Sequence, residues 1–159
     1  MATYRIELKW AFIFFVMYLA WIALEKVLGF HSSRIAYQQM MSVMVLIPSF
    51  LVYWFAIRDK KKNYFNNEIS FGQAFKSGMM LTVFVVLLSP LSQIIAMKII
   101  SPDFFTNMRA YAVGVYGMSE QEADSKLNIG AYLIASVFGG LVTGLIFSLI
   151  VAAFLRKMI

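Results

Sequence analysis

The sequence has no cysteine, one histidine and few charged residues, and each shortage excludes a class of function. Without cysteine there is no disulfide framework, no thiolate nucleophile and no cysteine-ligated zinc or iron–sulfur site. The lone His31 has no second histidine or cysteine with which to bind a metal, so we expect neither a metal nor a cofactor. Charged residues make up 14% of the 159 positions, whereas soluble domains carry about 25%. These shortages argue against a soluble enzyme.

Hydrophobic residues are abundant instead, at 61% of the chain, and the mean hydropathy is +0.75. A helix needs about 20 mostly apolar residues to cross the hydrocarbon core of a bilayer. Four stretches meet that requirement, at about 10–29, 40–57, 77–97 and 131–155. They do not alternate between apolar and polar residues, as the strands of a membrane barrel do. We therefore expect an all-α fold, with four transmembrane helices in a single domain over residues 1–159.

The distribution of lysine and arginine predicts how the four spans are threaded, because cytoplasmic loops are enriched in these residues. The N-terminus, the connection at 58–76 and the C-terminus share one side, which holds nine bases and three acids. The other side holds five bases and five acids. We expect the protein to lie in the bacterial inner membrane with both termini in the cytoplasm.

One basic run follows the second span and consists of Arg58, Lys60, Lys61 and Lys62. Bases beside a span attract anionic lipid headgroups, and each contributes about 1 kcal/mol. The chain has no second basic face and no interleaved aromatic platform of the kind that binds nucleic acid. We therefore expect this run to contact anionic lipid, and we expect no nucleic-acid partner.

The connection between the third and fourth spans, at about 98–128, is too long for a simple turn. Ser101, Pro102 and Asp103 are typical of an N-cap, a first helical position and a first turn. Apolar residues follow at helical spacing, at Phe105, Met108, Ala112 and Val115. This pattern predicts an amphipathic helix on the outer membrane surface.

Two glycines and a second capping pattern follow that helix. We expect Gly114 and Gly117 to end it. Ser119 and Glu122 match a capping box, so a second helix starts there and has room to continue into the fourth span. The whole connection is either a lid or docking platform, or a plain connector that covers the outer end of the bundle.

Small residues recur every four positions along the fourth span, at Ser136, Gly140, Gly144, Ser148 and Ala152. Lipid supplies little hydrophobic drive for helix association, so close backbone approach through small residues has to supply the contact. This small-residue face must therefore meet another helix. That helix belongs either to the same chain or to a partner, which would be a second copy or a larger membrane protein.

Polar residues inside the spans are candidates for function, because burying them in lipid is costly. At 1.5 Å per residue, Glu25 lies about 21 Å along the first span from Ala11, below the outer boundary. Gln93 lies at a similar depth on the third span. The candidate intramembrane polar cluster consists of Glu25, Ser89, Gln93 and Lys98, in which Lys98 is near enough to pair with Glu25. It is either an outward-facing proton or substrate site, or structural glue between helices.

Pro90 follows Ser89 directly and lacks a backbone N–H, which leaves one carbonyl for a hydroxyl, a water or a ligand. Ser89 and His31 make too weak a pair for Ser–His catalysis, since a nucleophile, a base and an orienting group are needed together. We therefore expect no catalytic residue and no enzyme.

Three segments resemble the small membrane proteins catalogued as domain of unknown function 4199 (DUF4199). They are SFGQAFKSG at 70–78, ISPDF at 100–104, and the final stretch at 144–157. The resemblance extends over nearly the whole chain. It implies a four-span protein of the bacterial inner membrane, and it supplies no site residues.

These observations favour a non-enzymatic membrane protein that acts through helix association, as a homo-oligomer or as an accessory subunit of a membrane or envelope assembly. The alternative is a small transporter or channel subunit with an outward-facing polar site. Four spans are few for a complete carrier, and the two halves show no convincing repeat. An intramembrane enzyme is the third alternative.

Overall fold

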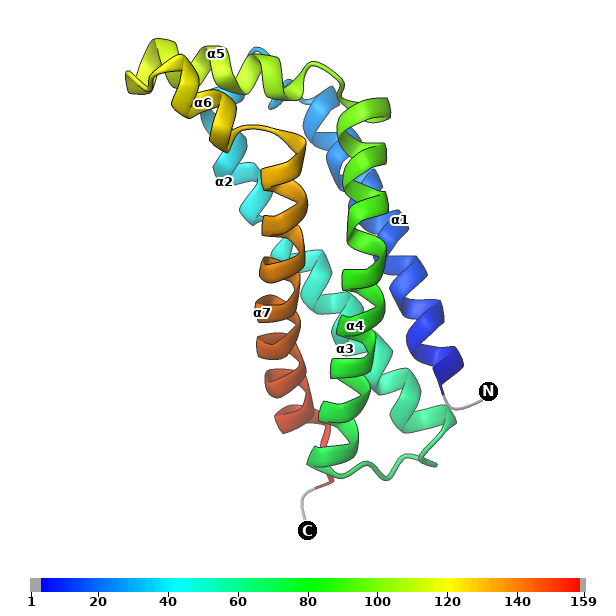
Figure 1. The fold of residues 1–159 in the computed structure, drawn as a ribbon. Coiled ribbons are helices and arrows are strands. Elements are labelled where there is room, and N and C mark those ends of the chain that lie inside the picture. Colours follow the sequence, from blue (N-terminus) through cyan, green and yellow to red (C-terminus); the bar gives the residue numbers. More distant parts are fainter. Residues whose placement is uncertain (1–3, 158–159) are drawn as a thin grey trace.

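The computed structural model describes residues 4–157, and within that range the secondary structure consists of helices without strands. Four long helical segments lie side by side as a bundle (Figure 1). They are α1 (Arg5–Val27), η2 through α3 (Ile35–Asn63), α4 with η3 (Phe71–Ile100), and α7 (Ile129–Leu155). Each is long and apolar enough to cross a membrane. The prediction of an all-α fold with four transmembrane helices is confirmed.

The second span is divided where the sequence predicts a continuous helix. It begins with the 3-10 helix η2 (Ile35–Tyr37), continues as α2 (Gln38–Val43) and resumes as α3 (Leu46–Asn63). The break follows from Pro48, because a proline ring clashes with the carbonyl four residues earlier, on Met44. Pro48 therefore lies in the first turn of α3, where a missing N–H is tolerated.

The third span tolerates its proline. Helix α4 (Phe71–Ile95) continues through Pro90, and the carbonyl that this proline leaves without a helical partner is that of Val86. The Ser89 hydroxyl donates to this carbonyl at 2.9 Å. The carbonyl left without a helical partner is thus bound by a hydroxyl of the chain itself, one of the three partners that the sequence allowed. The span ends in the π-helical turn η3 (Ala96–Ile100).

The small-residue face of α7 packs against α4, which is its closest neighbour in the bundle. A Cβ added to Gly144 would lie 2.4 Å from the Thr82 side chain. A Cβ added to Gly78 of α4 would lie 2.5 Å from Ser148 Oγ, and Ala152 is completely buried. The face therefore packs against a helix of the same chain.

Two shorter helices, α5 (Phe104–Tyr116) and α6 (Glu120–Lys126), lie across one end of the bundle (Figure 1). Both termini lie at the opposite end. We call these two ends the α5–α6 end and the terminal end. The long connection thus forms helices, as the sequence predicts.

The first of these helices begins later than expected. Asp103 occupies the N-cap position of α5, and Ser101 lies before it. The physical reason is that the Ser101 hydroxyl lies 2.8 Å from His31 Nδ1, so it does not cap the helix. Gly117 ends α5 with a left-handed φ of 66°, as predicted, whereas Gly114 lies inside the helix.

The second short helix starts at the predicted cap, where Ser119 Oγ accepts from the Glu122 N–H at 3.2 Å. It ends at Lys126 and does not continue into the fourth span. Asn128 provides a separate cap for α7, because its Oδ1 accepts from the Ala131 N–H at 3.0 Å.

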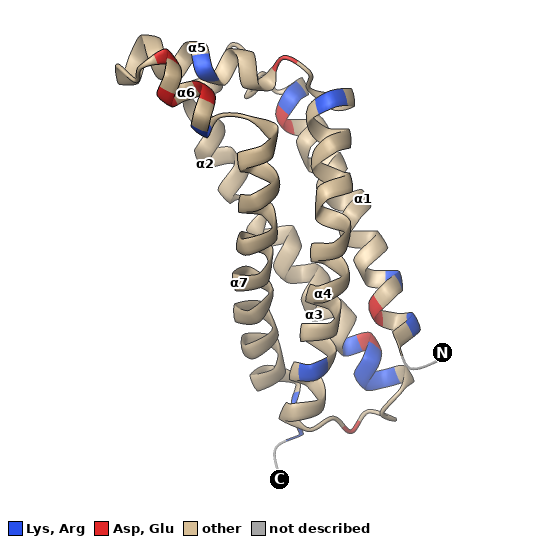
Figure 2. Cartoon of the chain, viewed as in Figure 1, with Lys and Arg blue, Asp and Glu red and all other residues tan. Residues whose placement is uncertain are grey.

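Basic residues gather at the terminal end, mainly where α3 finishes (Figure 2). Arg58 and Lys62 are exposed there. Lys61 is half-buried, and its Nζ donates to the Leu155 carbonyl at 2.9 Å. Not every base of the run therefore faces outward.

Lys60 departs furthest from the expected lipid contact, because it is buried inside the bundle. Its Nζ lies 3.0 Å from Oε1 and 3.2 Å from Oε2 of Glu7, which is also buried. Ser77 Oγ donates to the same carboxylate at 2.8 Å. The physical reason for the correction is that α1, α3 and α4 converge at this point and enclose the ion pair.

Candidate functional site

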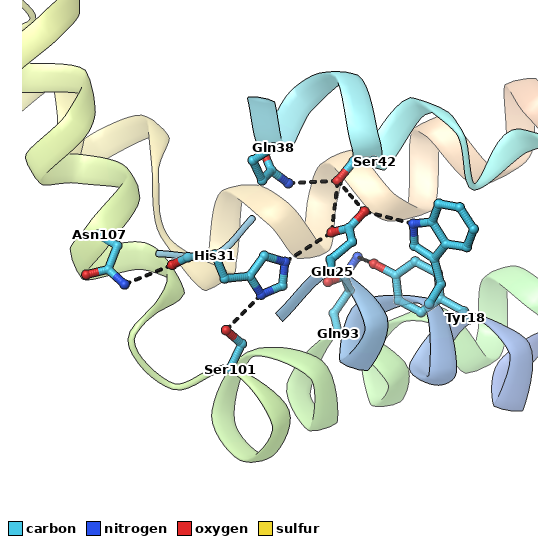
Figure 3. A network of polar contacts seen from close by, with 9 residues as sticks. Tyr18, Glu25, His31, Gln38, Ser42, Gln93, Ser101 and Asn107 are labelled. Carbon is cyan, nitrogen blue, oxygen red and sulfur yellow. Dashed lines mark hydrogen bonds and ion pairs between the residues drawn. The ribbon is translucent and has the colours of Figure 1, made fainter. Parts of the chain in front are cut away.

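Glu25 lies in the last turn of α1 and is completely buried at the α5–α6 end (Figure 3). Trp21 Nε1 donates to its Oε1 at 2.8 Å. Ser42 Oγ, which accepts from Gln38 Nε2 at 2.7 Å, lies 2.9 and 3.1 Å from the two carboxylate oxygens. His31 Nε2 lies 3.0 Å from Oε2. These partners compensate the carboxylate for the water that it has lost.

The turn after α1 brings His31 back to Glu25. Gly29 adopts a φ of +83°, which side chains with a Cβ rarely allow, and a Cβ there would lie 2.7 Å from Ser33 Oγ. The Phe30 N–H donates to the Glu25 carbonyl at 3.0 Å, so the chain reverses within a few residues. The glycine is therefore what allows the imidazole and the carboxylate to meet.

His31 is itself buried and held by the segment that follows the third span (Figure 3). Its Nδ1 lies 2.8 Å from Ser101 Oγ. Its ring packs edge-on against Phe104, with 4.8 Å between the ring centroids. Asn107 Nδ2 donates to the His31 backbone carbonyl at 2.8 Å. The Glu25–His31 pair therefore ties α1 to the start of α5.

A cavity of about 410 Å³ adjoins this network. Its lining includes Glu25, His31, Gln38, Ser42 and Gln93. A second cavity of about 230 Å³ shares lining residues with the first and extends toward the middle of the bundle. Ligand pockets in proteins commonly measure about 300–1,000 Å³, so the first cavity is large enough for a small molecule.

Gln93 lies where the two cavities meet, since it lines both. Its Nε2 donates to the Tyr18 hydroxyl at 2.9 Å. Its Oε1 is buried and has no hydrogen-bond partner among the described residues. Buried polar atoms are nearly always paired in proteins, so an acceptor left unpaired at a cavity is suited to a donor from outside the chain.

The predicted polar cluster is partly assembled. Glu25 and Gln93 line the same cavity, whereas Ser89 lines the second cavity and donates to a backbone carbonyl. Lys98 is exposed, and no ion pair within residues 4–157 joins it to Glu25. The expected pairing with Lys98 does not form, because η3 presents this side chain outward and His31 occupies the carboxylate instead.

Sequence reasoning missed His31 as the partner of Glu25, together with Trp21 and Ser42. One signal was available, because Trp21 and Glu25 are four residues apart and share a helix face. Another was Gly29, which stands between the end of the span and His31 and permits a reversal of the chain. The contribution of Ser42 from α2 had no signal of this kind.

All of these residues lie within 9–157, the region that matches the family model described as protein of unknown function (DUF4199). The chain belongs to this family. The resemblance noted in the sequence is thereby confirmed. Searches of curated proteins and of solved structures found no match. The family description assigns no activity, so the chemistry of the site has to be inferred from its geometry.

Ser101, His31 and Glu25 stand in the order of a hydrolase triad, from hydroxyl to imidazole to carboxylate. A nucleophile must reach its substrate, but Ser101 is not among the described residues that line either cavity. Its N–H donates to the Ala96 carbonyl at 2.8 Å in the turn that closes η3. This arrangement suits the positioning of His31 better than nucleophilic attack.

Proposed function

We propose that this protein is a non-enzymatic, multi-pass protein of the bacterial inner membrane that binds a small ligand in a polar site near the outer side. The observation that carries the proposal is the completely buried Glu25 carboxylate at the edge of a cavity of about 410 Å³. Ionisable groups inside a membrane are costly and commonly mark substrate or ion pathways. Ligand binding by a small transporter or channel subunit is the function that this geometry supports best.

Association with a second copy or with a larger membrane protein has less support. The small-residue face of α7 motivated that interpretation, and α4 of the same chain already occupies this face. A partner would have to use the outward-facing apolar surfaces of the bundle, which lipid also covers. The position of Ser101 away from both cavities favours a role without nucleophilic catalysis.

The proposal includes an orientation, with both termini in the cytoplasm and the α5–α6 end outside. The excess of nine bases over three acids on the terminal side supports it. The exposed Arg58 and Lys62 are suited to contact anionic headgroups of the cytoplasmic leaflet, at about 1 kcal/mol each. In this orientation the cavity beside Glu25 lies in the outer half of the bundle.

The test is whether a water-soluble reagent reaches the cavity, and the absence of native cysteine makes single-cysteine variants straightforward. Val45 lines both cavities. Ile94 is exposed on the face of α4 that points away from the bundle, and it lines neither cavity. In spheroplasts, we expect a membrane-impermeant cationic methanethiosulfonate to label Val45→Cys at least ten times faster than Ile94→Cys. Equal labelling rates would contradict a water-accessible site.

A further inference from the structure

We infer that the ligand is a single-chain amphiphile with a cationic, hydrogen-bond-donating head, of the class of long-chain primary amines. The head lies near Glu25 and Gln93, and the tail extends through the second cavity toward the middle of the bundle. This inference rests on the proposed function and goes further by naming the chemical class of the ligand.

The head group is indicated by the acceptors that face the first cavity. Gln93 Oε1 is buried, unpaired among the described residues, and located where the two cavities meet. Glu25 borders the same space with a carboxylate, which accepts hydrogen bonds and donates none when ionised. The unpaired Gln93 acceptor therefore requires a donor, and the carboxylate beside it favours a donor that carries positive charge, such as an ammonium group.

The sign of the charge points the same way. No lysine or arginine is among the described residues that line either cavity. Lys26, Arg34 and Lys98 lie toward the α5–α6 end of the bundle, but none of them is among the residues that line the site. Glu25 is the one aspartate or glutamate among the described residues that line the two cavities. An anionic head would find no cation there to offset its desolvation, whereas a cationic head faces a carboxylate.

The tail is indicated by the walls of the second cavity. Aromatic and aliphatic side chains from α1, α3, α4 and α7 dominate this lining. Three of its serines turn their hydroxyls to backbone carbonyls of their own helices, namely Ser89 to Val86, Ser92 to Ser89 and Ser136 to Leu133. These hydroxyl protons are already used, so the cavity offers a largely apolar surface to a ligand.

The shape of the combined space favours a chain over a compact molecule. Along α1 the lining extends from Ala11 in the second cavity to Glu25 in the first. Fourteen residues of helix separate these two positions, which corresponds to about 21 Å. An alkyl chain can extend along this length while its head remains at the polar end.

The experiment measures binding of tritiated dodecylamine to the full-length chain in phosphatidylcholine nanodiscs, with empty nanodiscs as the background. Dodecanol and dodecanoate have the same tail with a neutral or an anionic head, and butylamine has the same head with a short tail. We expect saturable binding of one dodecylamine per protein. We expect each of the other three compounds to compete at least ten times less effectively.

Two variants test the two ends of the site. Gln93→Met removes the unpaired acceptor and is expected to weaken dodecylamine binding about tenfold. Gly139→Leu adds a side chain to the wall of the second cavity at a position where a Cβ meets nothing within 4 Å. It is expected to weaken dodecylamine binding about tenfold without disturbing the fold. Gly114→Leu is the matched control, because Gly114 is equally open but lies on α5 and lines neither cavity.

The outcomes separate this inference from the proposed function. Equal competition by dodecanol, or unchanged binding to both Gln93→Met and Gly139→Leu, would overturn the assignment of an amine-headed amphiphile. Absence of saturable binding would also overturn it, and fast labelling of Val45→Cys would then leave the proposed function standing. If Val45→Cys is labelled no faster than Ile94→Cys as well, both proposals fail.

Discussion

Replacing Lys60 with methionine is expected to destabilise the bundle strongly, because it leaves the Glu7 carboxylate buried without its cation. Both carboxylate oxygens contact Lys60 Nζ, at 3.0 and 3.2 Å, and the two residues are only 4% and 2% exposed. After the substitution, the hydrogen bond from Ser77 Oγ at 2.8 Å remains, but it does not neutralise the charge. Removing one member of a buried ion pair costs about 3–5 kcal/mol, and we expect a loss of that size.

The double variant Glu7→Leu/Lys60→Met is expected to recover most of this loss. Replacing both charges with apolar side chains of similar volume is often neutral or stabilising, because neither ion then has to be desolvated. The coupling energy between the two sites should therefore be about 3 kcal/mol. A double-mutant cycle, which compares the double variant with the two single variants, measures this coupling because the two residues contact each other directly.

The measurement is reversible unfolding of the four proteins of this cycle in mixed micelles, followed by far-ultraviolet circular dichroism. The control is the cycle Glu68→Gln and Lys157→Met, since that pair is exposed and solvent screens its attraction. We expect no measurable coupling in the control. A loss below about 0.5 kcal/mol for Lys60→Met, or additive effects of the two substitutions, would refute the argument.

Three further predictions concern packing, pH and topology. Gly144→Ile should lower the free energy of unfolding by about 2–3 kcal/mol, because a Cβ at this position would lie 2.4 Å from the Thr82 side chain on α4. Leu145→Ile, on the exposed face of the same helix, should change the free energy of unfolding little. The Lys157 ammonium lowers the pKa of the Glu68 carboxyl. The contact between the two side chains is therefore present above the ordinary glutamate pKa and is lost as the pH falls through the lowered value. Lys157→Met should raise the pKa of Glu68, as measured by NMR. Asn63→Cys should resist impermeant reagents in intact spheroplasts.

Each of these three predictions has a clear contrary result. Equal stability of Gly144→Ile and the native chain would mean that α7 does not pack against α4 through this face. An unchanged Glu68 pKa in Lys157→Met would mean that the two side chains do not interact in solution. Rapid labelling of Asn63→Cys from outside would reverse the proposed orientation.

The Glu25–His31 pair also serves the architecture, whatever ligand occupies the cavity. It joins α1 to the segment that begins with Ser101, and Asn107 adds a bond to the His31 backbone. These hydrogen bonds hold α5 across the end of the bundle.

Local sequence determined the number and character of the spans, because crossing a bilayer requires only length and apolar composition along one continuous stretch. Two helix ends were also predictable, since Ser119 and Gly117 act on backbone groups within a few residues of themselves, whereas Ser101 was diverted from its predicted cap by His31. The spacing of small residues on α7 likewise predicted a close helix contact. All of these features depend on neighbours along the chain.

Only the tertiary structure decided which polar groups meet. Depth arithmetic placed Glu25 and Gln93 at the same level, but it could not assign a rotation to each helix, so Lys98 seemed available and His31 did not. His31 reaches the carboxylate through the turn at Gly29, and Ser42 reaches it because Pro48 divides the second span. Hydrogen bonds act over about 3 Å, so a partner is determined by helix rotation and loop geometry, which hydropathy does not encode.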